Sequence, residues 1–87
     1  MSAAPATILV VEDETALRQV LQRALTRQGY RVLAAGSAET AYELLGSERA
    51  DAVLLDVHLP VMSGLALYLA ILHRSPTLAG RIAIMTG

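Results

Sequence analysis

The chain has 87 residues, which suits one small folded domain, and its 54% hydrophobic and 17% charged residues exclude a disordered polar tail. A formal net charge of −1 gives no basic surface for nucleic acid, and the lack of cysteine excludes a disulfide framework and a thiolate metal site. The longest uninterrupted apolar run, residues 65–72, is far shorter than the roughly 20 residues of a membrane-spanning helix. We therefore expect no membrane association, and a cytoplasmic location fits this composition.

The first part of the chain predicts a strand followed by a helix. The run "TILVV", Thr7 to Val11, is β-branched and apolar, as is typical of a buried parallel strand. Residues 1–6 before it are expected to form a flexible tail. Apolar residues then recur at helical spacing from Leu17 to Leu25, and Gly29 stands where a helix commonly ends.

The same alternation continues to the end of the chain. Further strands are predicted at residues 31–35, 51–56 and 81–85. A second helix should begin after Ser37, a good N-cap residue, and end at Gly46. A third helix is predicted at about residues 64–73, before Pro76. The order βαβαβαβ predicts one α/β domain over residues 7–87, with parallel strands and helices on both faces of the sheet.

Acidic residues end two of these predicted strands. Glu12 and Asp13 follow the first strand, and Asp56 ends the third. Ligands of open parallel sheets bind at the carboxyl ends of the strands, so the three carboxylates meet there if the strands are neighbours. Crowded carboxylates resist ionisation, and a divalent cation relieves that repulsion; oxygen ligands without histidine or cysteine suit Mg²⁺. An aspartate in such a site can act as a nucleophile toward phosphorus.

These motifs resemble the receiver domain of two-component response regulators. The resemblance runs from Thr7 to Gly87 and rests on "ILVVEDE", "LLDVHLPVMSG" and "IAIMTG" at the ends of the first, third and fourth strands. It implies a flavodoxin-like, doubly wound parallel sheet in strand order 2-1-3-4, truncated after the fourth strand. The fifth strand and the last two helices of the family have no counterpart in these residues. The family's active-site lysine has none either, because all seven basic residues are arginines.

The resemblance also implies roles for single residues. Asp56 would be the phosphoacceptor, and Mg²⁺ would be held by Glu12, Asp13, Asp56 and the backbone carbonyl of His58. Thr86 would contact the phosphoryl group, while Pro60 and Gly64 would shape the loop after the acceptor. The alternative from the residues alone is that the acids after the first strand only stabilise a helix N-terminus, and that Asp56 is an ordinary turn aspartate.

Three functions from different classes are compatible with these features. The first is a receiver module, not an enzyme, that accepts a phosphoryl group from a sensor histidine kinase or a phosphotransfer protein. The second is an interaction or dimerisation module, derived from a receiver and impaired in phosphorylation. The third, a small Mg²⁺-dependent phosphatase or phosphotransferase, is disfavoured because no second general acid is visible near Asp56.

The third predicted helix suggests a contact surface. Its segment "LALYLAIL" is apolar all round, which is unusual for a helix that faces water. Receivers usually carry charged residues at the outer positions, which are occupied here by Ala66, Leu69, Ala70 and Leu72. A chance run of good helix formers is the alternative. Because the fourth strand would also be an open sheet edge, we expect a homo-oligomer that uses both features.

Overall fold

The computed structural model describes residues 4–56 and 64–85. It contains one parallel sheet of four strands: β1 (Thr7–Val11), β2 (Arg31–Ala35), β3 (Ala52–Asp56) and β4 (Ile82–Met85). The strand order is β2-β1-β3-β4, and each neighbouring pair is parallel. This confirms the predicted α/β fold and the strand order 2-1-3-4.

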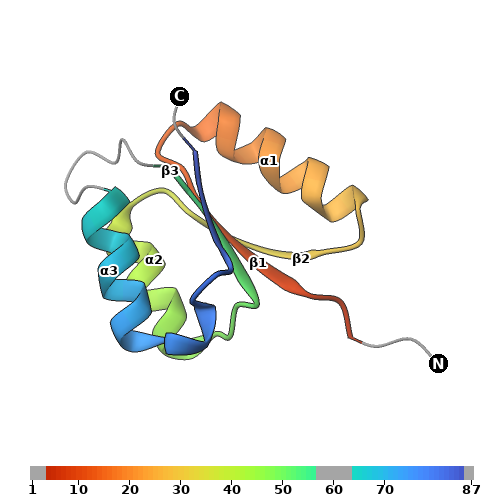
Figure 1. The fold of residues 1–87 in the computed structure, drawn as a ribbon. Coiled ribbons are helices and arrows are strands. Elements are labelled where there is room, and N and C mark those ends of the chain that lie inside the picture. The colour runs from red at the N-terminus through yellow and green to blue at the C-terminus, as the bar shows by residue number, and fades with distance from the viewer. Residues whose placement is uncertain (1–3, 57–63, 86–87) are drawn as a thin grey trace.

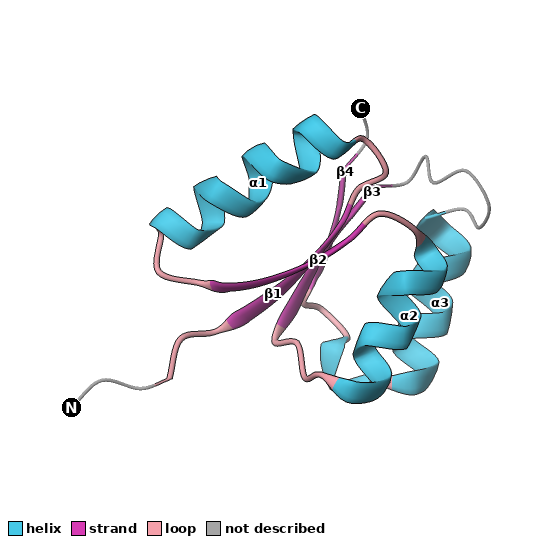
Figure 2. Ribbon diagram, turned by 180° about the vertical axis from the view of Figure 1, so that it is seen from behind, coloured by secondary structure: helices cyan, strands magenta, loops and turns pink. Residues whose placement is uncertain are grey.

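Helices cover the two faces of the sheet. Helix α1 (Thr15–Arg27) lies on one face, while α2 (Ala38–Ser47) and α3 (Gly64–Arg74) lie together on the other (Figures 1 and 2). A short 3₁₀ helix, Pro76–Leu78, follows α3 and leads into β4. Among the residues that the structure describes, no helix combines the length and the apolarity that a membrane crossing requires.

The main hydrophobic core lies between the sheet and the pair α2 and α3. Leu9 and Leu55 from the sheet are fully buried, and they pack in one cluster with the equally buried Leu67 and Ile71 of α3. Full burial of such side chains stabilises a fold by about 1.5–3 kcal/mol each. This core explains why α3 is apolar on the side that faces the sheet.

The face under α1 is covered less completely. No residue of α1 is buried, and Val20 is 57% exposed. An open hollow of about 350 Å³ lies beside this helix, lined in part by Leu25 of α1, Leu54 of β3 and Ala83 of β4. The two faces of the sheet therefore differ: one is a closed core and the other keeps exposed apolar surface.

Two of the predicted helix boundaries depend on single residues that the structure confirms. The hydroxyl oxygen of Ser37 accepts a hydrogen bond from the backbone N–H of Thr40 at 3.1 Å, which caps the start of α2. Gly29 has φ +95°, a conformation that glycine adopts readily, and it follows the last turn of α1.

The prediction that Gly46 ends the second helix is wrong, because α2 continues through Ser47. Gly46 has a packing role instead. A β-carbon at this position would lie 2.5 Å from Nη2 of Arg74, a distance that would force the arginine to move. The guanidinium carbon of Arg74 lies 4.4 Å from the centre of the Tyr42 ring, in cation–π geometry. The glycine therefore makes room for a contact between α2 and α3.

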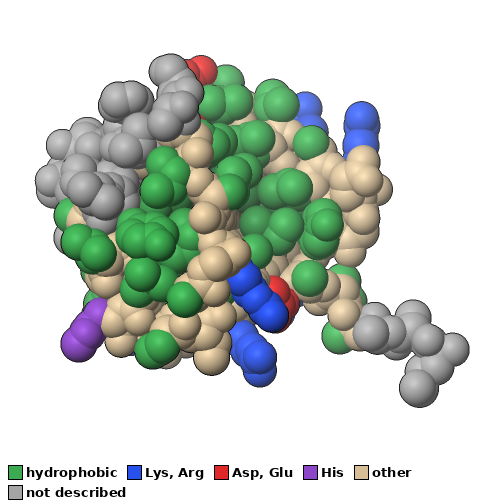
Figure 3. Space-filling model, in the orientation of Figure 1, with side chains coloured by type: hydrophobic (Ala, Val, Ile, Leu, Met, Phe, Trp, Pro, Cys, Tyr) green, Lys and Arg blue, Asp and Glu red, His purple; other side chains and the backbone are tan. Residues whose placement is uncertain are grey.

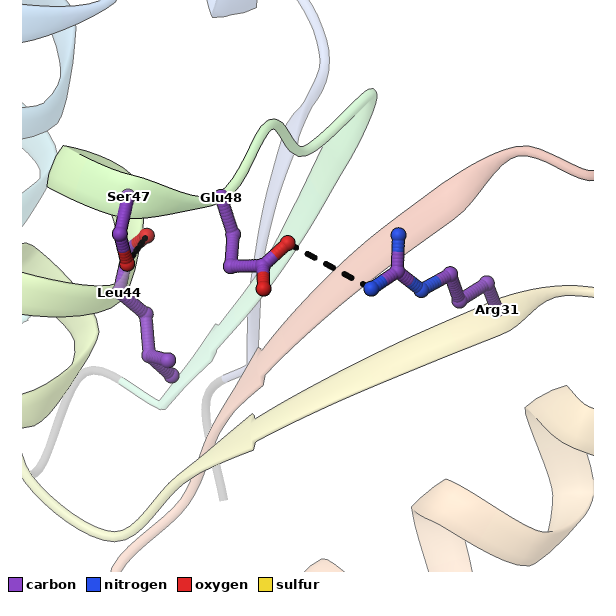
Figure 4. Close-up of polar contacts among 4 residues, drawn as sticks. All are labelled: Arg31, Leu44, Ser47 and Glu48. Atoms are coloured by element: carbon purple, nitrogen blue, oxygen red, sulfur yellow. Dashed lines mark hydrogen bonds and ion pairs between the residues drawn. The ribbon is translucent and has the colours of Figure 1, made fainter.

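A second polar contact links α2 to the sheet at the end far from the acidic residues. Nη2 of Arg31, at the start of β2, lies 3.4 Å from Oε2 of Glu48, just after α2 (Figure 4). Both side chains are partly exposed, so the pair stabilises the fold by at most about 1 kcal/mol. The hydroxyl of Ser47 donates to the carbonyl of Leu44 nearby (Figure 4).

Candidate functional site

The three predicted carboxylates meet at the carboxyl edge of the sheet. Strands β1 and β3 are direct neighbours, with Val11 beside Leu55, so Glu12 after β1 comes next to Asp56 at the end of β3. One carboxylate oxygen from each of Glu12, Asp13 and Asp56 lies within 4.8 Å of the other two. The predicted convergence is therefore confirmed, and we call these three residues the acidic cluster.

Glu12 is the buried member of the cluster. It is only 4% exposed, and its backbone N–H donates to the carbonyl of Ala35 in β2 at 3.0 Å. Its side-chain oxygen Oε2 accepts a hydrogen bond from the backbone N–H of Glu14 at 3.1 Å. The carboxylate is thus held by a hydrogen bond from its own loop.

The electrostatics of the cluster suit a cation. Burial raises the pKa of Glu12, and hydrogen bonds to Asp13 and Asp56, together with the negative charge of Asp56, raise this pKa further. The backbone N–H of Glu14 opposes the shift because it stabilises the ionised form. A divalent cation would offset both the cost of desolvation and the repulsion, and three oxygen ligands fit Mg²⁺. The donor set therefore fits the expected metal.

Arg18 belongs to the surroundings of the cluster and was not among the predicted site residues. Its Nη1 donates to the backbone carbonyl of Glu12 at 2.9 Å and to that of Asp13 at 3.4 Å. Its position gave a usable signal, because a cation near the start of a helix opposes the helix dipole. An arginine at this position is therefore expected to make a favourable contact outside its own helix.

Several predicted site residues cannot be placed. His58, Pro60 and Thr86 lie outside the described residues, so their roles stay predictions. Gly64 is the first residue of α3.

The residues of the predicted contact surface lie on α3 and are not part of the acidic cluster. Leu69 is 59% exposed and Ala66 is exposed as well, whereas Ala70 and Leu72 are partly buried.

Comparisons with known proteins identify the same family throughout. Residues 8–87 match the family model described as "Response regulator receiver domain". The DNA-binding transcriptional regulator NtrC of Proteus hauseri is 39% identical over 79 residues, which are 91% of this chain and 16% of NtrC. The transcriptional regulatory protein AfsQ1 of Streptomyces coelicolor is 45% identical over 58 residues, which are 67% of this chain and 26% of AfsQ1. The chain thus spans about a quarter or less of these relatives.

Solved structures share the fold. A CheY-like receiver domain of Methanospirillum hungatei superposes with a TM-score of 0.90 at 28% identity, over 95% of this chain and 65% of that one. A response regulator of Burkholderia pseudomallei, solved with a phosphorylated aspartic acid and a calcium ion, has a TM-score of 0.86 at 33% identity, over 94% of this chain and 47% of that one.

A third solved relative, TrrA of Thermotoga maritima, was crystallised in two informative states. Its complex with Mg²⁺ and BeF has a TM-score of 0.80 at 32% identity, over 91% of this chain and 65% of that one. Its complex with the histidine kinase ThkA gives 0.85 at 32% identity, over 94% and 69%. The match of the family model over residues 8–87, with which the strand order and the acidic cluster agree, shows that the chain belongs to the receiver domain family of two-component response regulators.

Proposed function

We propose that this receiver accepts a phosphoryl group on Asp56 while Glu12, Asp13 and Asp56 hold Mg²⁺. The observation that carries the proposal is the meeting of three carboxylate oxygens within 4.8 Å at the ends of neighbouring strands. The phosphorylated aspartic acid of the Burkholderia pseudomallei relative and the Mg²⁺ and BeF of TrrA support it. The backbone carbonyl of His58 would complete the protein ligands, and the hydroxyl of Thr86 would contact the phosphoryl group.

In the proposed transfer, one oxygen of Asp56 forms a bond with phosphorus as the P–N bond of a phosphohistidine breaks. The electron pair of that bond leaves with the imidazole nitrogen, which then takes a proton from solvent. Bound Mg²⁺ would supply positive charge against the phosphoryl oxygens. Glu12 keeps its carboxylate turned toward the cluster, because Glu14 N–H fixes one of its oxygens. Pro60 and Gly64 would set the course of the loop after Asp56.

The proposed donor is a sensor histidine kinase or a phosphotransfer protein. The complex between TrrA and the histidine kinase ThkA supports this class of partner. A cytoplasmic location is part of the same proposal.

A second candidate function, an interaction module that forms homo-oligomers, is favoured by one observation. Strand β4 is at the end of the sheet, with no strand on its outer side among the described residues. Hydrophobic side chains gather on this face, between α1 and α3 (Figure 3), and Ile84 of β4 is 42% exposed. Open edges of this kind pair with other chains. We propose that β4 and the α3 residues Ala66, Leu69, Ala70 and Leu72 contribute to such contacts.

Incubation with acetyl phosphate, with and without Mg²⁺, tests the first function. Intact mass spectrometry should show one added phosphoryl group that requires Mg²⁺ and is lost in Asp56→Asn. The control Glu43→Gln removes an exposed acid of α2 and should leave the modification unchanged. A wild-type protein that folds but takes up no phosphoryl group would favour the interaction module, and uptake by Asp56→Asn would refute the assignment of Asp56.

A further inference from the structure

The guanidinium of Arg18 lies between two loops at the edge of the acidic cluster. It starts on α1 and reaches back to the loop between β1 and α1, where it donates to the carbonyls of Glu12 and Asp13. Its second nitrogen, Nη2, lies 3.4 Å from the hydroxyl of Thr15. The same group lies against the turn between β2 and α2, since a β-carbon at Gly36 would be 3.0 Å from Nη1.

These contacts restrict the backbone on both sides of the Asp13 Cα. The carbonyl of Glu12 belongs to the peptide plane before the Cα of Asp13, and the carbonyl of Asp13 belongs to the plane after it. When both planes are anchored to one guanidinium, the two backbone rotations of Asp13 are restricted, and with them the direction of its Cα–Cβ bond. Asp13 is exposed, so packing does little to hold it.

Arginine is suited to this position in a way that lysine is not. Its Nη1 donates to both carbonyls while Nη2 faces the hydroxyl of Thr15, so two nitrogens of one rigid plane are engaged together, whereas a lysine has a single terminal nitrogen and cannot make both sets of contacts. Gly36 leaves the guanidinium undisturbed: a β-carbon there would be 3.0 Å from Nη1, so Arg18 would have to give way by a few tenths of an ångström.

We infer that Arg18 is a positioning residue of the metal site, which holds the Asp13 carboxylate toward Glu12 and Asp56, and that Gly36 is glycine in order to leave room for it. The inference rests on the proposed Mg²⁺ site. It predicts that Arg18 strengthens Mg²⁺ binding, although its positive charge alone would weaken it. A cation close to a metal site repels Mg²⁺, so charge alone predicts tighter binding when Arg18 is removed, whereas loss of positioning predicts weaker binding.

Magnesium titration of the full chain, followed by backbone amide NMR, separates these effects. Arg18→Gln should weaken Mg²⁺ binding by about tenfold, the lower end of what the loss of a metal ligand's supporting partner costs. The matched control Arg23→Gln removes the same charge from an exposed position of the same helix and should leave affinity unchanged or slightly higher. Arg18→Lys keeps the charge and should still bind more weakly than wild type.

A double-mutant cycle tests the link to Gly36. Gly36→Ala should weaken binding too, and the double variant with Arg18→Gln should be no weaker than Arg18→Gln alone, because both changes remove one contact. Fully additive losses would refute the role of Gly36. Unchanged or tighter Mg²⁺ binding in folded Arg18→Gln or Arg18→Lys would overturn the inference.

Spectra recorded without Mg²⁺ test the role of Arg18 independently of the proposed metal site. The amide signals of Asp13 and Glu14 should shift in both Arg18 variants and in Gly36→Ala, but not in Arg23→Gln. A wild-type chain that binds no Mg²⁺ would refute the proposed metal site, and in that case these shifts still decide whether Arg18 positions the loop. Unmoved amides would show that it does not.

Discussion

Two leucines of α3, two positions apart, should respond to substitution in opposite ways. Leu67 is fully buried in the core, whereas Leu69 is 59% exposed on the outer side of the helix. Leu67→Ala should lower the free energy of unfolding by about 2–5 kcal/mol, because it leaves a cavity. That is a large part of the roughly 5–15 kcal/mol that stabilises a small domain. Leu69→Ala removes little buried area and should leave the unfolding of a monomer nearly unchanged.

The exposed leucine has a measurable effect only if it is a contact residue. Burying a whole leucine side chain is worth about 1.5–3 kcal/mol, so the exposed 59% of Leu69 can still contribute roughly 1–2 kcal/mol in each protomer. In a two-fold dimer the residue occurs twice, and Leu69→Ala should then raise the dissociation constant by about thirtyfold or more.

Sedimentation velocity over a range of low micromolar concentrations, combined with thermal unfolding, can measure both effects. The expected result is weaker association with unchanged monomer unfolding for Leu69→Ala, and lower stability for Leu67→Ala. Association that is equally strong in wild type and Leu69→Ala would remove α3 from the proposed interface. A wild-type chain that stays a cooperative, well-folded monomer would refute the oligomer as a whole.

Three further outcomes are expected. In Asp13→Ala, Mg²⁺ binding should be lost in a titration; affinity equal to wild type would rule Asp13 out as a ligand. Glu12 has a raised pKa in the folded state, so its contribution to stability is present below the ordinary glutamate range and is lost as the pH rises through the raised value. Glu12→Gln should therefore raise the melting temperature of the metal-free protein at about pH 8, with the gain disappearing below about pH 4; a gain independent of pH would contradict this. Ser37→Ala should cost about 0.5–2 kcal/mol in urea unfolding, Ser37→Asn much less, and equal losses would argue against the cap.

The sheet and the meeting of its acids could be predicted because both depend on simple periodic features. Parallel strands buried on both faces appear as short apolar runs, and the predicted bounds of β1 and β2 match the structure. Once β1 and β3 are neighbours, the residues that end them must lie side by side, whatever their loops do. The position of Asp56 beside Glu12 follows from this strand order together with the register, in which Val11 pairs with Leu55.

The role of Arg18 could not be predicted in this way, because it depends on the direction of two backbone carbonyls in a loop. No periodicity encodes that direction, and only the misplaced charge near the start of α1 hinted at it. The sequence pattern also could not predict that the two faces of the sheet are covered unequally. The stripe from Leu17 to Leu25 predicts a helix with a buried side, yet no residue of α1 is buried.

Two glycines show the same limit of sequence reasoning. Gly36 and Gly46 stand where a chain break is expected, and a break explains Gly36 in part, since it follows β2. In each case, however, the space of the missing side chain is taken by an arginine from another element: Arg18 beside Gly36, and Arg74 beside Gly46. A glycine can be required by the space around it as well as by its backbone conformation, and that space depends on residues distant in the sequence. Gly46 lies inside α2, one residue before its end, with Arg74 of α3 beside it.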